Sequence, residues 1–203
     1  MPPDYEFTAD WFSHVESVWE QLLTQITPSR VLEIGSYEGR SACFLIERIA
    51  AERPLEIRCI DSWSGALDDA NGIDFAAVEE RFDRNTAAAI ARAAHPVALH
   101  KIKGASHLQL AKLLAAGEGG FDLVYVDGSH HAPDVLADAV LGFHLLGAGG
   151  MMIFDDYLWP PGPNASCDHY RMPKPAIDAF VNIYRQQLEL IRAPLYQLFV
   201  RKL

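Results

Sequence analysis

Short apolar runs and longer amphipathic stretches alternate along most of this chain. The apolar runs have the length of strands and end at an acid or near a glycine, whereas the stretches between them repeat apolar positions every three to four residues, as helices do. This pattern predicts strands over 30–34, 56–60, 97–102, 121–126 and 150–154, and helices over 39–51, 75–93, 106–115, 133–146 and 174–187. Such alternation is typical of an α/β fold with a doubly wound, mostly parallel sheet.

The two ends of the chain depart from that alternation. Apolar residues at helical spacing from Trp11 to Leu23 predict an N-terminal helix within residues 1–27. Near the other end, the apolar runs 188–192 and 195–201 are separated by only Ala193 and Pro194, which is too short for a crossover helix. They should form a C-terminal antiparallel hairpin that completes a seven-stranded sheet. Residues 1–203 contain no linker or repeat, so we expect a single domain.

Composition narrows the classes of partner. The net charge is −10 and the pI about 5.2, so nucleic acid and anionic membranes would meet a mostly repulsive surface, and we expect neither as a partner. The first residues lack the basic start and apolar stretch of a signal peptide, which favours a cytoplasmic location. Cys43, Cys59 and Cys167 have no metal-type spacing and should be small apolar fillers. The aromatic N-terminal helix is compatible with a homodimer.

The turn after the first predicted strand carries the clearest functional signal. The segment VLEIGSYEGRS places Glu33, Gly35 and Gly39 between an apolar run and an amphipathic helix, so the backbone can turn sharply and approach a ligand beside a helix N-terminus. The spacing lacks the middle glycine of loops that bind a dinucleotide pyrophosphate. It therefore favours a ligand without pyrophosphate, with S-adenosylmethionine as the leading candidate. An ordinary tight strand-to-helix turn is the alternative.

Other strand ends supply groups suited to a nucleoside. Asp61 closes the second strand and could accept both ribose hydroxyls, although it could equally form a turn or cap a helix. The segment from Lys103 to Ser106 lies where an adenine edge would meet backbone amides, but Ser106, paired with Gln109 in a capping box, has a sufficient structural role as a helix cap. The predicted cofactor contacts are Glu33, Gly35, Tyr37, Gly39, Ser41, Asp61, Ser62, Trp63, Ala105, Ser106 and Asp127.

Three carboxylates follow the fourth and fifth strands. Asp127 closes one strand and Asp155-Asp156 the next, so all three should reach one crevice, where like charges about 4 Å apart repel by roughly 4 kcal/mol at an effective dielectric near 20. A divalent cation such as Mg²⁺ would relieve this repulsion, because it prefers oxygen ligands. The alternative is that the three acids cap turns and bind backbone amides. His130 is the candidate general base and His131 the second choice, since a neutral imidazole can accept a proton near pH 7.

Together these residues resemble the class I S-adenosylmethionine-dependent methyltransferases, and among them the macrolide-sugar and aminocoumarin-sugar O-methyltransferases. The segment VLEIGSYEGRSACFLIE is similar to the glycine loop of catechol O-methyltransferase, and the likeness extends over about 30–157. It implies a Rossmann-like fold, Mg²⁺ ligands at Asp127, Asp155 and Asp156, and a basic residue at His130, where the catechol enzymes have lysine. It also implies direct methyl transfer to a hydroxyl of a small molecule, sugar or catechol-like.

Two further points concern the acceptor and the competing functions. The aromatic and proline-rich segment 158–175 is predicted to form a lid loop, with Trp63 facing the same opening; the alternative is a surface loop without a catalytic part. One rival function is an iron-dependent hydroxylase that uses Asp127, His130 or His131, and His169. The nucleoside-type strand ends argue against it. The other rival is a non-catalytic module that binds S-adenosylmethionine without turnover.

Overall fold

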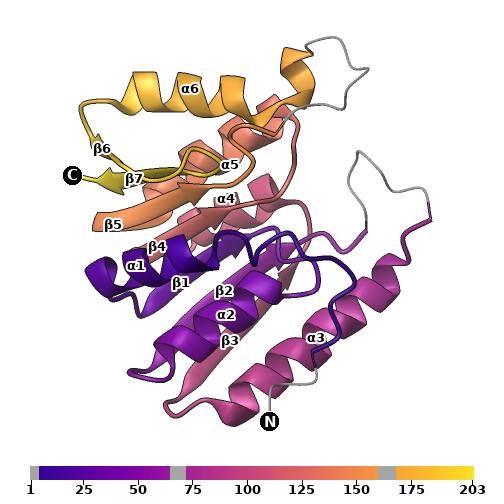
Figure 1. Cartoon of the computed structure of the whole chain (residues 1–203). Coiled ribbons are helices and arrows are strands. Elements are labelled where there is room, and N and C mark those ends of the chain that lie inside the picture. Colours follow the sequence, from indigo (N-terminus) through magenta and orange to yellow (C-terminus); the bar gives the residue numbers. More distant parts are fainter. Residues whose placement is uncertain (1–4, 65–71, 160–167) are drawn as a thin grey trace.

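The computed structural model describes residues 5–64, 72–159 and 168–203, and it contains one mixed sheet of seven strands covered by helices on both faces (Figure 1). The strands are β1 (Arg30–Ile34), β2 (Leu55–Asp61), β3 (Val97–Lys103), β4 (Phe121–Val126), β5 (Leu146–Phe154), β6 (Leu188–Ile191) and β7 (Leu198–Lys202). The helices are α1 (Glu16–Ile26), α2 (Arg40–Ile49), α3 (Phe75–Arg92), α4 (Ser106–Ala115), α5 (Ala132–Leu145) and α6 (Pro173–Tyr184), with a short 3-10 helix η1 (His169–Arg171).

The strand order is β3-β2-β1-β4-β5-β7-β6. Strands β1 to β5 are parallel, whereas β7 is antiparallel to both β5 and β6, which confirms the predicted C-terminal hairpin. The chain runs outward from β1 to β3 and then returns to place β4 beside β1. Strand order therefore reverses between β1 and β4, and ligands of doubly wound sheets gather at that point, at the carboxyl ends of the strands.

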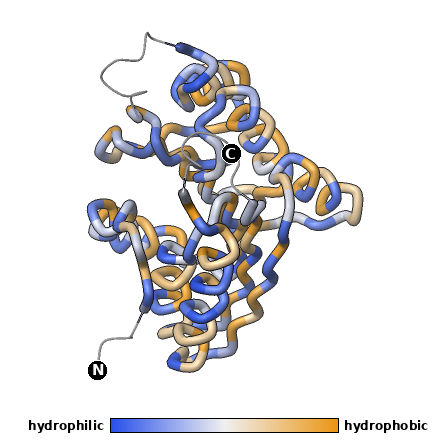
Figure 2. The backbone as a smooth tube through the Cα atoms, turned by 90° about the vertical axis from the view of Figure 1, so that its right-hand side faces the viewer, coloured by the Kyte–Doolittle hydropathy of each residue, from blue (hydrophilic) through white to orange (hydrophobic). Residues whose placement is uncertain are grey.

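Alternation along the strands divides the core into two layers. Val31 and Tyr125 pack in one cluster with residues of α1, α2 and α3, whereas Leu32 and Val124 pack in the other with residues of α4, α5 and α6. Successive strand residues point to opposite faces of a sheet, and these strands are apolar on both faces because helices cover both. The tube in Figure 2 shows hydrophobic and hydrophilic positions alternating along the helices as well as the strands.

The N-terminal segment differs from the prediction, because the helix begins at Glu16 rather than near Trp11. The carboxylate of Asp10 accepts hydrogen bonds from the amide and hydroxyl of Ser13, and turns follow, in which the amide of Val15 donates to the carbonyl of Phe12 (3.0 Å). In Figure 1 the segment before α1 passes along α3 and then crosses to α1. α1 packs on the core through Val15, Trp19 and Leu22. A homodimer through this helix stays a prediction.

Two other local predictions need correction. The capping box is wrong: Ala105 is the N-cap residue of α4 without a side-chain hydrogen bond, and the side-chain amide of Gln109 donates to the carbonyl of Lys103 instead (3.3 Å). The proposed lid segment 158–175 contains η1 and the start of α6, where Pro173 fits the first helical turn. Residues 160–167 of that segment, Cys167 among them, lie outside the described residues, as do residues 65–71.

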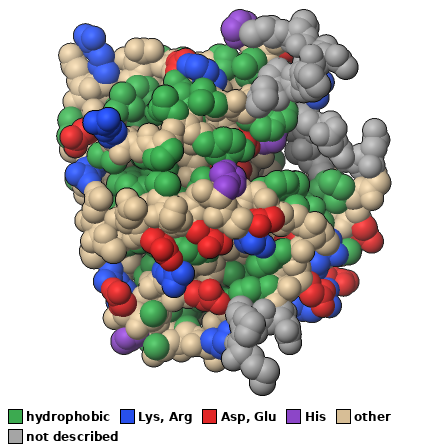
Figure 3. Space-filling view, viewed as in Figure 1, with side chains coloured by type: hydrophobic (Ala, Val, Ile, Leu, Met, Phe, Trp, Pro, Cys, Tyr) green, Lys and Arg blue, Asp and Glu red, His purple; other side chains and the backbone are tan. Residues whose placement is uncertain are grey.

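Burial and surface charge agree with the composition. Cys43 and Cys59 are buried and carry free thiols, and burial raises the pKa of both. On the face shown in Figure 3, side chains of both charge signs lie side by side over α2 and α3. Arg48 of α2, for example, pairs with Glu20 of α1 (2.6 Å). Within the described ranges, every helix is too short or too polar to cross a membrane.

Candidate active site

The glycine turn after β1 is packed directly against the end of β4. Gly35 has a φ of +87°, and a Cβ atom at this residue would lie 1.9 Å from the carbonyl oxygen of Asp127. The amide of Asp127 in turn donates to the carbonyl of Ile34 (2.8 Å). Glycine is therefore required here by a backbone contact within the protein as well as by φ. Gly39, with a φ of +80°, is the N-cap residue of α2.

The side chain of Glu33 is hydrogen bonded to the turn and to the helix that follows it. Its carboxylate has no solvent exposure and accepts hydrogen bonds from the hydroxyls of Ser36 (2.5 Å) and Ser41 (2.6 Å). Burial raises the pKa of Glu33, and the two hydroxyl bonds act in the opposite direction. The side chain thus connects β1, the turn and α2 at the site where a cofactor would lie.

Asp61, at the end of β2, fixes the other side of the turn. One carboxylate oxygen, Oδ2, accepts the amides of Ser36 (2.9 Å) and Tyr37 (2.8 Å), and the other, Oδ1, accepts the amide of Trp63 (2.8 Å). The carbonyl of Asp61 accepts the amide of Gly104, which brings the end of β3 to the same edge. Each carboxylate oxygen can accept about two hydrogen bonds, so Oδ1 can accept one more donor.

Trp63 corrects one expectation, because its side chain is buried and does not face the opening. The indole is 3% exposed, donates from Nε1 to the carbonyl of Tyr37 (2.9 Å) and packs on Phe82 with ring centroids 4.9 Å apart. Tyr37 itself has a φ of +47°. The hydroxyl of Ser62 accepts the amide of Ser64 (3.4 Å). These residues therefore hold the turn in shape.

The β3–α4 connection brings Ala105 and Ser106 to the same edge. Ser106 begins α4 and lies near Asp138, a fully buried carboxyl in the middle of α5. Neither oxygen of Asp138 has a hydrogen bond of normal distance and angle, although the Ser106 hydroxyl is close enough to favour its charged form. Burial outweighs that contact and raises the pKa of Asp138 to about 7.

Asp127 and Asp155 lie on neighbouring strands and share one partner. The phenol oxygen of Tyr125 lies 2.9 Å from Oδ2 of Asp127 and also bonds Oδ2 of Asp155. Burial raises the pKa of both carboxyls, and their mutual repulsion with Asp156 raises them further. A phenol has one proton to donate, so it cannot satisfy both carboxylates at once.

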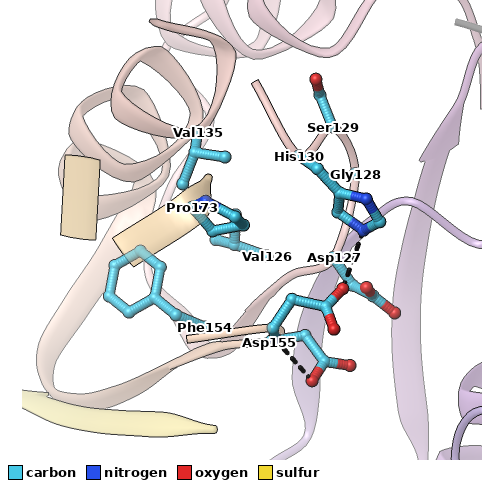
Figure 4. Close-up of a pocket in the computed structure, with 10 residues that line it drawn as sticks. Val126, Asp127, Gly128, Ser129, His130, Val135, Phe154, Asp155 and Pro173 are labelled. Atoms are coloured by element: carbon cyan, nitrogen blue, oxygen red, sulfur yellow. Dashed lines mark hydrogen bonds and ion pairs between the residues drawn. The ribbon is translucent and has the colours of Figure 1, made fainter. Parts of the chain in front are cut away.

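Asp156 is held by two side chains at the mouth of the site. Nε2 of His130 lies 2.8 Å from its Oδ2, and the hydroxyl of Tyr196 donates to its Oδ1 (2.9 Å). The imidazole of His130 also packs on Trp159, with ring centroids 4.3 Å apart. Figure 4 shows His130 directed toward the carboxylates of the strand ends, in a small pocket that Val135, Phe154 and Pro173 close on its apolar side.

Comparison with known proteins identifies the family. A family model for a methyltransferase domain matches residues 32–157, which is more than half of the chain. The chain belongs to this methyltransferase family. It is an S-adenosylmethionine-dependent methyltransferase of class I, as the resemblance implied. The search of curated proteins found no match.

Solved structures of methyltransferases share the fold. One is the O-methyltransferase TomG from Streptomyces achromogenes, which is involved in tomaymycin synthesis and was solved with S-adenosylmethionine. It is 19% identical to this chain with a TM-score of 0.63, and the match covers 98% of this chain and 82% of TomG. An O-methyltransferase from Bacillus cereus with S-adenosylhomocysteine is 14% identical (TM-score 0.59; 98% and 84% covered). MycE of the mycinamycin pathway, solved with Mg and S-adenosylhomocysteine, is 17% identical (TM-score 0.61; 96% and 51% covered).

The acidic edge of this methyltransferase suits a hard cation by the chemistry of its donors. The carboxylates of Asp127, Asp155 and Asp156 meet there, burial raises the pKa of the first two, and oxygen ligands are those that Mg²⁺ prefers. Their oxygens already bind Tyr125, His130 and Tyr196, and the described residues contain no group of three or more His, Cys, Asp or Glu arranged to hold a metal. His169, the third residue of the iron hypothesis, is exposed in η1 and belongs to no such group.

Several residues that shape the site escaped the sequence analysis. Glu38, inside the glycine turn, is 2% exposed and accepts the amide (2.6 Å) and hydroxyl (2.7 Å) of Thr8 and Nε of Arg81 (2.5 Å). The N-terminal segment and α3 are thereby tied to the turn. The sequence pattern placed Tyr196 in a strand and gave no sign that its hydroxyl would bind Asp156. The one signal in the sequence was the position of Glu38 between Gly35 and Gly39, and nothing in the sequence indicated its hydrogen-bond partners.

Proposed function

We propose that this chain transfers a methyl group from S-adenosylmethionine to a hydroxyl of a small molecule, with a divalent cation, Mg²⁺ first among them, at Asp127, Asp155 and Asp156. The observation that carries the proposal is the contact between the glycine turn and the acidic strand ends, where Gly35 packs on Asp127 and Asp127 shares Tyr125 with Asp155. The residues proposed for the nucleoside and the three carboxylates thereby share one edge of the sheet. The O-methyltransferases of similar fold support this assignment.

The cofactor would lie along the β1, β2 and β3 ends. Asp61 would accept ribose hydroxyls through its remaining lone pairs, while its amide contacts keep Tyr37 and the turn in place. Ala105 and Ser106 would border the adenine. Glu33 is buried behind two serine hydroxyls, so its part would be to hold the turn and to add negative potential near a sulfonium. When bound, S-adenosylmethionine supplies an electrophilic methyl group on its sulfonium sulfur.

The acceptor would meet the carboxylates and His130. Bound at the carboxylates, the cation would lower the pKa of the acceptor hydroxyl. His130 is the general base of the proposal: Nε2 lies at the mouth of the pocket and can accept the hydroxyl proton, and Trp159 packs against the ring. Asp156 would stabilise the imidazolium that results. Alignment of the hydroxyl with the methyl group would supply much of the acceleration.

Calorimetry and a methyl-transfer assay test the proposal together. Purified protein is titrated with S-adenosylhomocysteine and then assayed with S-adenosylmethionine and 3,4-dihydroxybenzoate or a 6-deoxyhexose as acceptor probes, with Mg²⁺ or EDTA. Asp155→Asn should abolish transfer and leave the S-adenosylhomocysteine affinity within about twofold, because Asp155 is not among the proposed cofactor contacts. Asp178→Asn is the matched control, since Asp178 lies on α6 and binds Lys174 and Tyr157 instead. Equal turnover in Asp155→Asn and the control would refute the role of the acidic pair.

A cation-independent reaction is the second candidate, and the contact between His130 and Asp156 favours it. An imidazole oriented by a carboxylate at 2.8 Å can accept a proton without a Lewis acid beside it. Full turnover in EDTA, lost in both His130→Ala and Asp156→Asn, would assign Asp156 to orienting His130. Binding of S-adenosylhomocysteine with no transfer to either probe would instead favour the non-catalytic module.

A further inference from the structure

A buried chain of polar and aromatic side chains leads from α1 to the acidic pair. Trp19 of α1 has no exposure, and its Nε1 donates to Oε1 of Gln197, 178 residues later in the sequence (2.8 Å). Gln197 is 2% exposed and lies in the turn before β7. The other side of its amide contacts the carboxylate of Asp155 and favours the charged form of that carboxylate. The chain thus ends on a proposed ligand of the cation.

The direction of the Gln197 amide follows from the chemistry of indole. An indole N–H can only donate, so Trp19 must face the oxygen of the amide, and the NH₂ group is left to face Asp155. This NH₂ group has no hydrogen bond of normal distance and angle. An apolar residue at position 197 would leave the buried indole N–H of Trp19 without an acceptor, so the amide oxygen has a structural role of its own. With the oxygen held by Trp19, the NH₂ group is kept on the side of the Asp155 carboxylate.

Trp19 also reaches the acidic pair by a second route. Its ring meets the ring of Tyr125 edge to face, with centroids 4.7 Å apart and planes at 83°. The hydroxyl of Tyr125 bonds the carboxylates of both Asp127 and Asp155. One indole therefore supports Asp155 from two sides, through the Gln197 amide and through the Tyr125 phenol.

We propose that Trp19 and Gln197 are positioning residues that fix the orientation of the Asp155 carboxylate for the reaction. This inference rests on the proposed function and adds to it, because neither residue touches the cofactor or the acceptor. It makes α1 and the β6–β7 turn parts of the catalytic apparatus. Groups that orient metal-binding or catalytic carboxylates commonly contribute about 10- to 100-fold to affinity or activity.

The first test uses nuclear magnetic resonance and needs no turnover. The chain has four tryptophans, so a ¹⁵N–¹H spectrum shows four indole signals at most, and Trp19→Phe assigns the one that disappears. Gln197→Leu removes the direct acceptor and serves as the positive control, and Asp155→Asn should move the Trp19 signal more than the control Asp178→Asn does. A Trp19 signal no more sensitive to Asp155→Asn than to Asp178→Asn would overturn the proposal, whether or not methyl transfer is found.

The second test separates positioning from packing. Gln197→Leu keeps the volume of the side chain but removes the acceptor of the buried Trp19 indole, so the thermal midpoint should fall. At a temperature where the variant stays folded, kcat for 3,4-dihydroxybenzoate should fall by about tenfold or more at unchanged S-adenosylhomocysteine affinity. Phe44→Leu is the matched control, because Phe44 packs on Trp19 outside the polar chain. Equal kcat in the two variants would refute a positioning role. If Asp155→Asn alone abolishes transfer, the proposed function stands while this inference fails.

Discussion

Asp138 offers a test of the electrostatics that requires no ligand. It is fully buried in the middle of α5, and an added Cβ on Gly128 would lie 3.5 Å from its Oδ2. Repulsion by Asp134 raises the pKa of Asp138 further, and the Ser106 hydroxyl lowers it. Burial is the largest of these effects, and the pKa of Asp138 rises from an ordinary value of 3.8 to about 7.

The magnitude follows from linkage between proton binding and folding. The folded-state pKa lies above the unfolded value, so the folded protein binds more protons between the two, and stability contributed at this residue falls as the pH rises through that window. Each tenfold change in the acid constant corresponds to about 1.4 kcal/mol, which gives about 4 kcal/mol of destabilisation above the folded-state pKa. From pH 5 to pH 8 the change is roughly 2.5 kcal/mol.

Asp138→Asn removes this titration. An asparagine amide carries its own burial cost, but that cost does not change with pH. The free energy of unfolding in urea, measured for both proteins at several pH values, should therefore shift in favour of the variant by roughly 2.5 kcal/mol between pH 5 and pH 8. Asp178→Asn, whose wild-type side chain is 43% exposed, should show no comparable shift. A difference between wild type and Asp138→Asn that stays constant across this range would refute the reasoning.

Two further predictions concern the cofactor turn. Gly35→Ala should abolish S-adenosylhomocysteine binding and lower the thermal midpoint, because its Cβ would collide with Asp127. Gly117→Ala is the control: its φ is also positive, but an added Cβ meets nothing within 4 Å, so it should carry the backbone penalty alone. Equal thermal midpoints in the two variants would contradict this prediction. Asp61→Asn should weaken S-adenosylhomocysteine binding at least about tenfold in calorimetry, since it removes the charge that orders Tyr37, and unchanged affinity would remove Asp61 from the site.

Local pattern was sufficient for the sheet and for which residues end its strands. The run from Arg30 to Ile34 is a strand with the predicted bounds. The predicted hairpin pairs in antiparallel fashion, although its connection spans residues 192–197 instead of two residues, which is still too short for a crossover helix. Since the carboxyl ends of parallel strands share one edge, Asp61, Asp127 and Asp155 could be expected there from the sequence. Their roles toward a cofactor or a cation stay predictions.

Contacts between distant residues could not be predicted in the same way. Glu38 binds Thr8 and Arg81 from opposite directions along the chain, and Trp19 binds Gln197 across 178 residues. Side-chain hydrogen bonds of this kind depend on which elements the fold brings together, and local periodicity does not contain that information.

The backbone at Asp156 explains how two consecutive acids can serve one pocket. In an extended strand, neighbouring side chains point to opposite faces, and β5 keeps that rule as far as Ile153, on the α1 side, and Phe154, on the α5 and α6 side. Asp155 continues the alternation and reaches Tyr125. Asp156 would then turn away, but its φ of +53° takes the chain out of the strand and leaves its carboxylate between His130 and Tyr196. Aspartate tolerates this left-handed conformation better than most residues, at a cost of roughly 1–2 kcal/mol. The backbone at residue 156 is therefore as much a part of the acidic site as the carboxylates themselves.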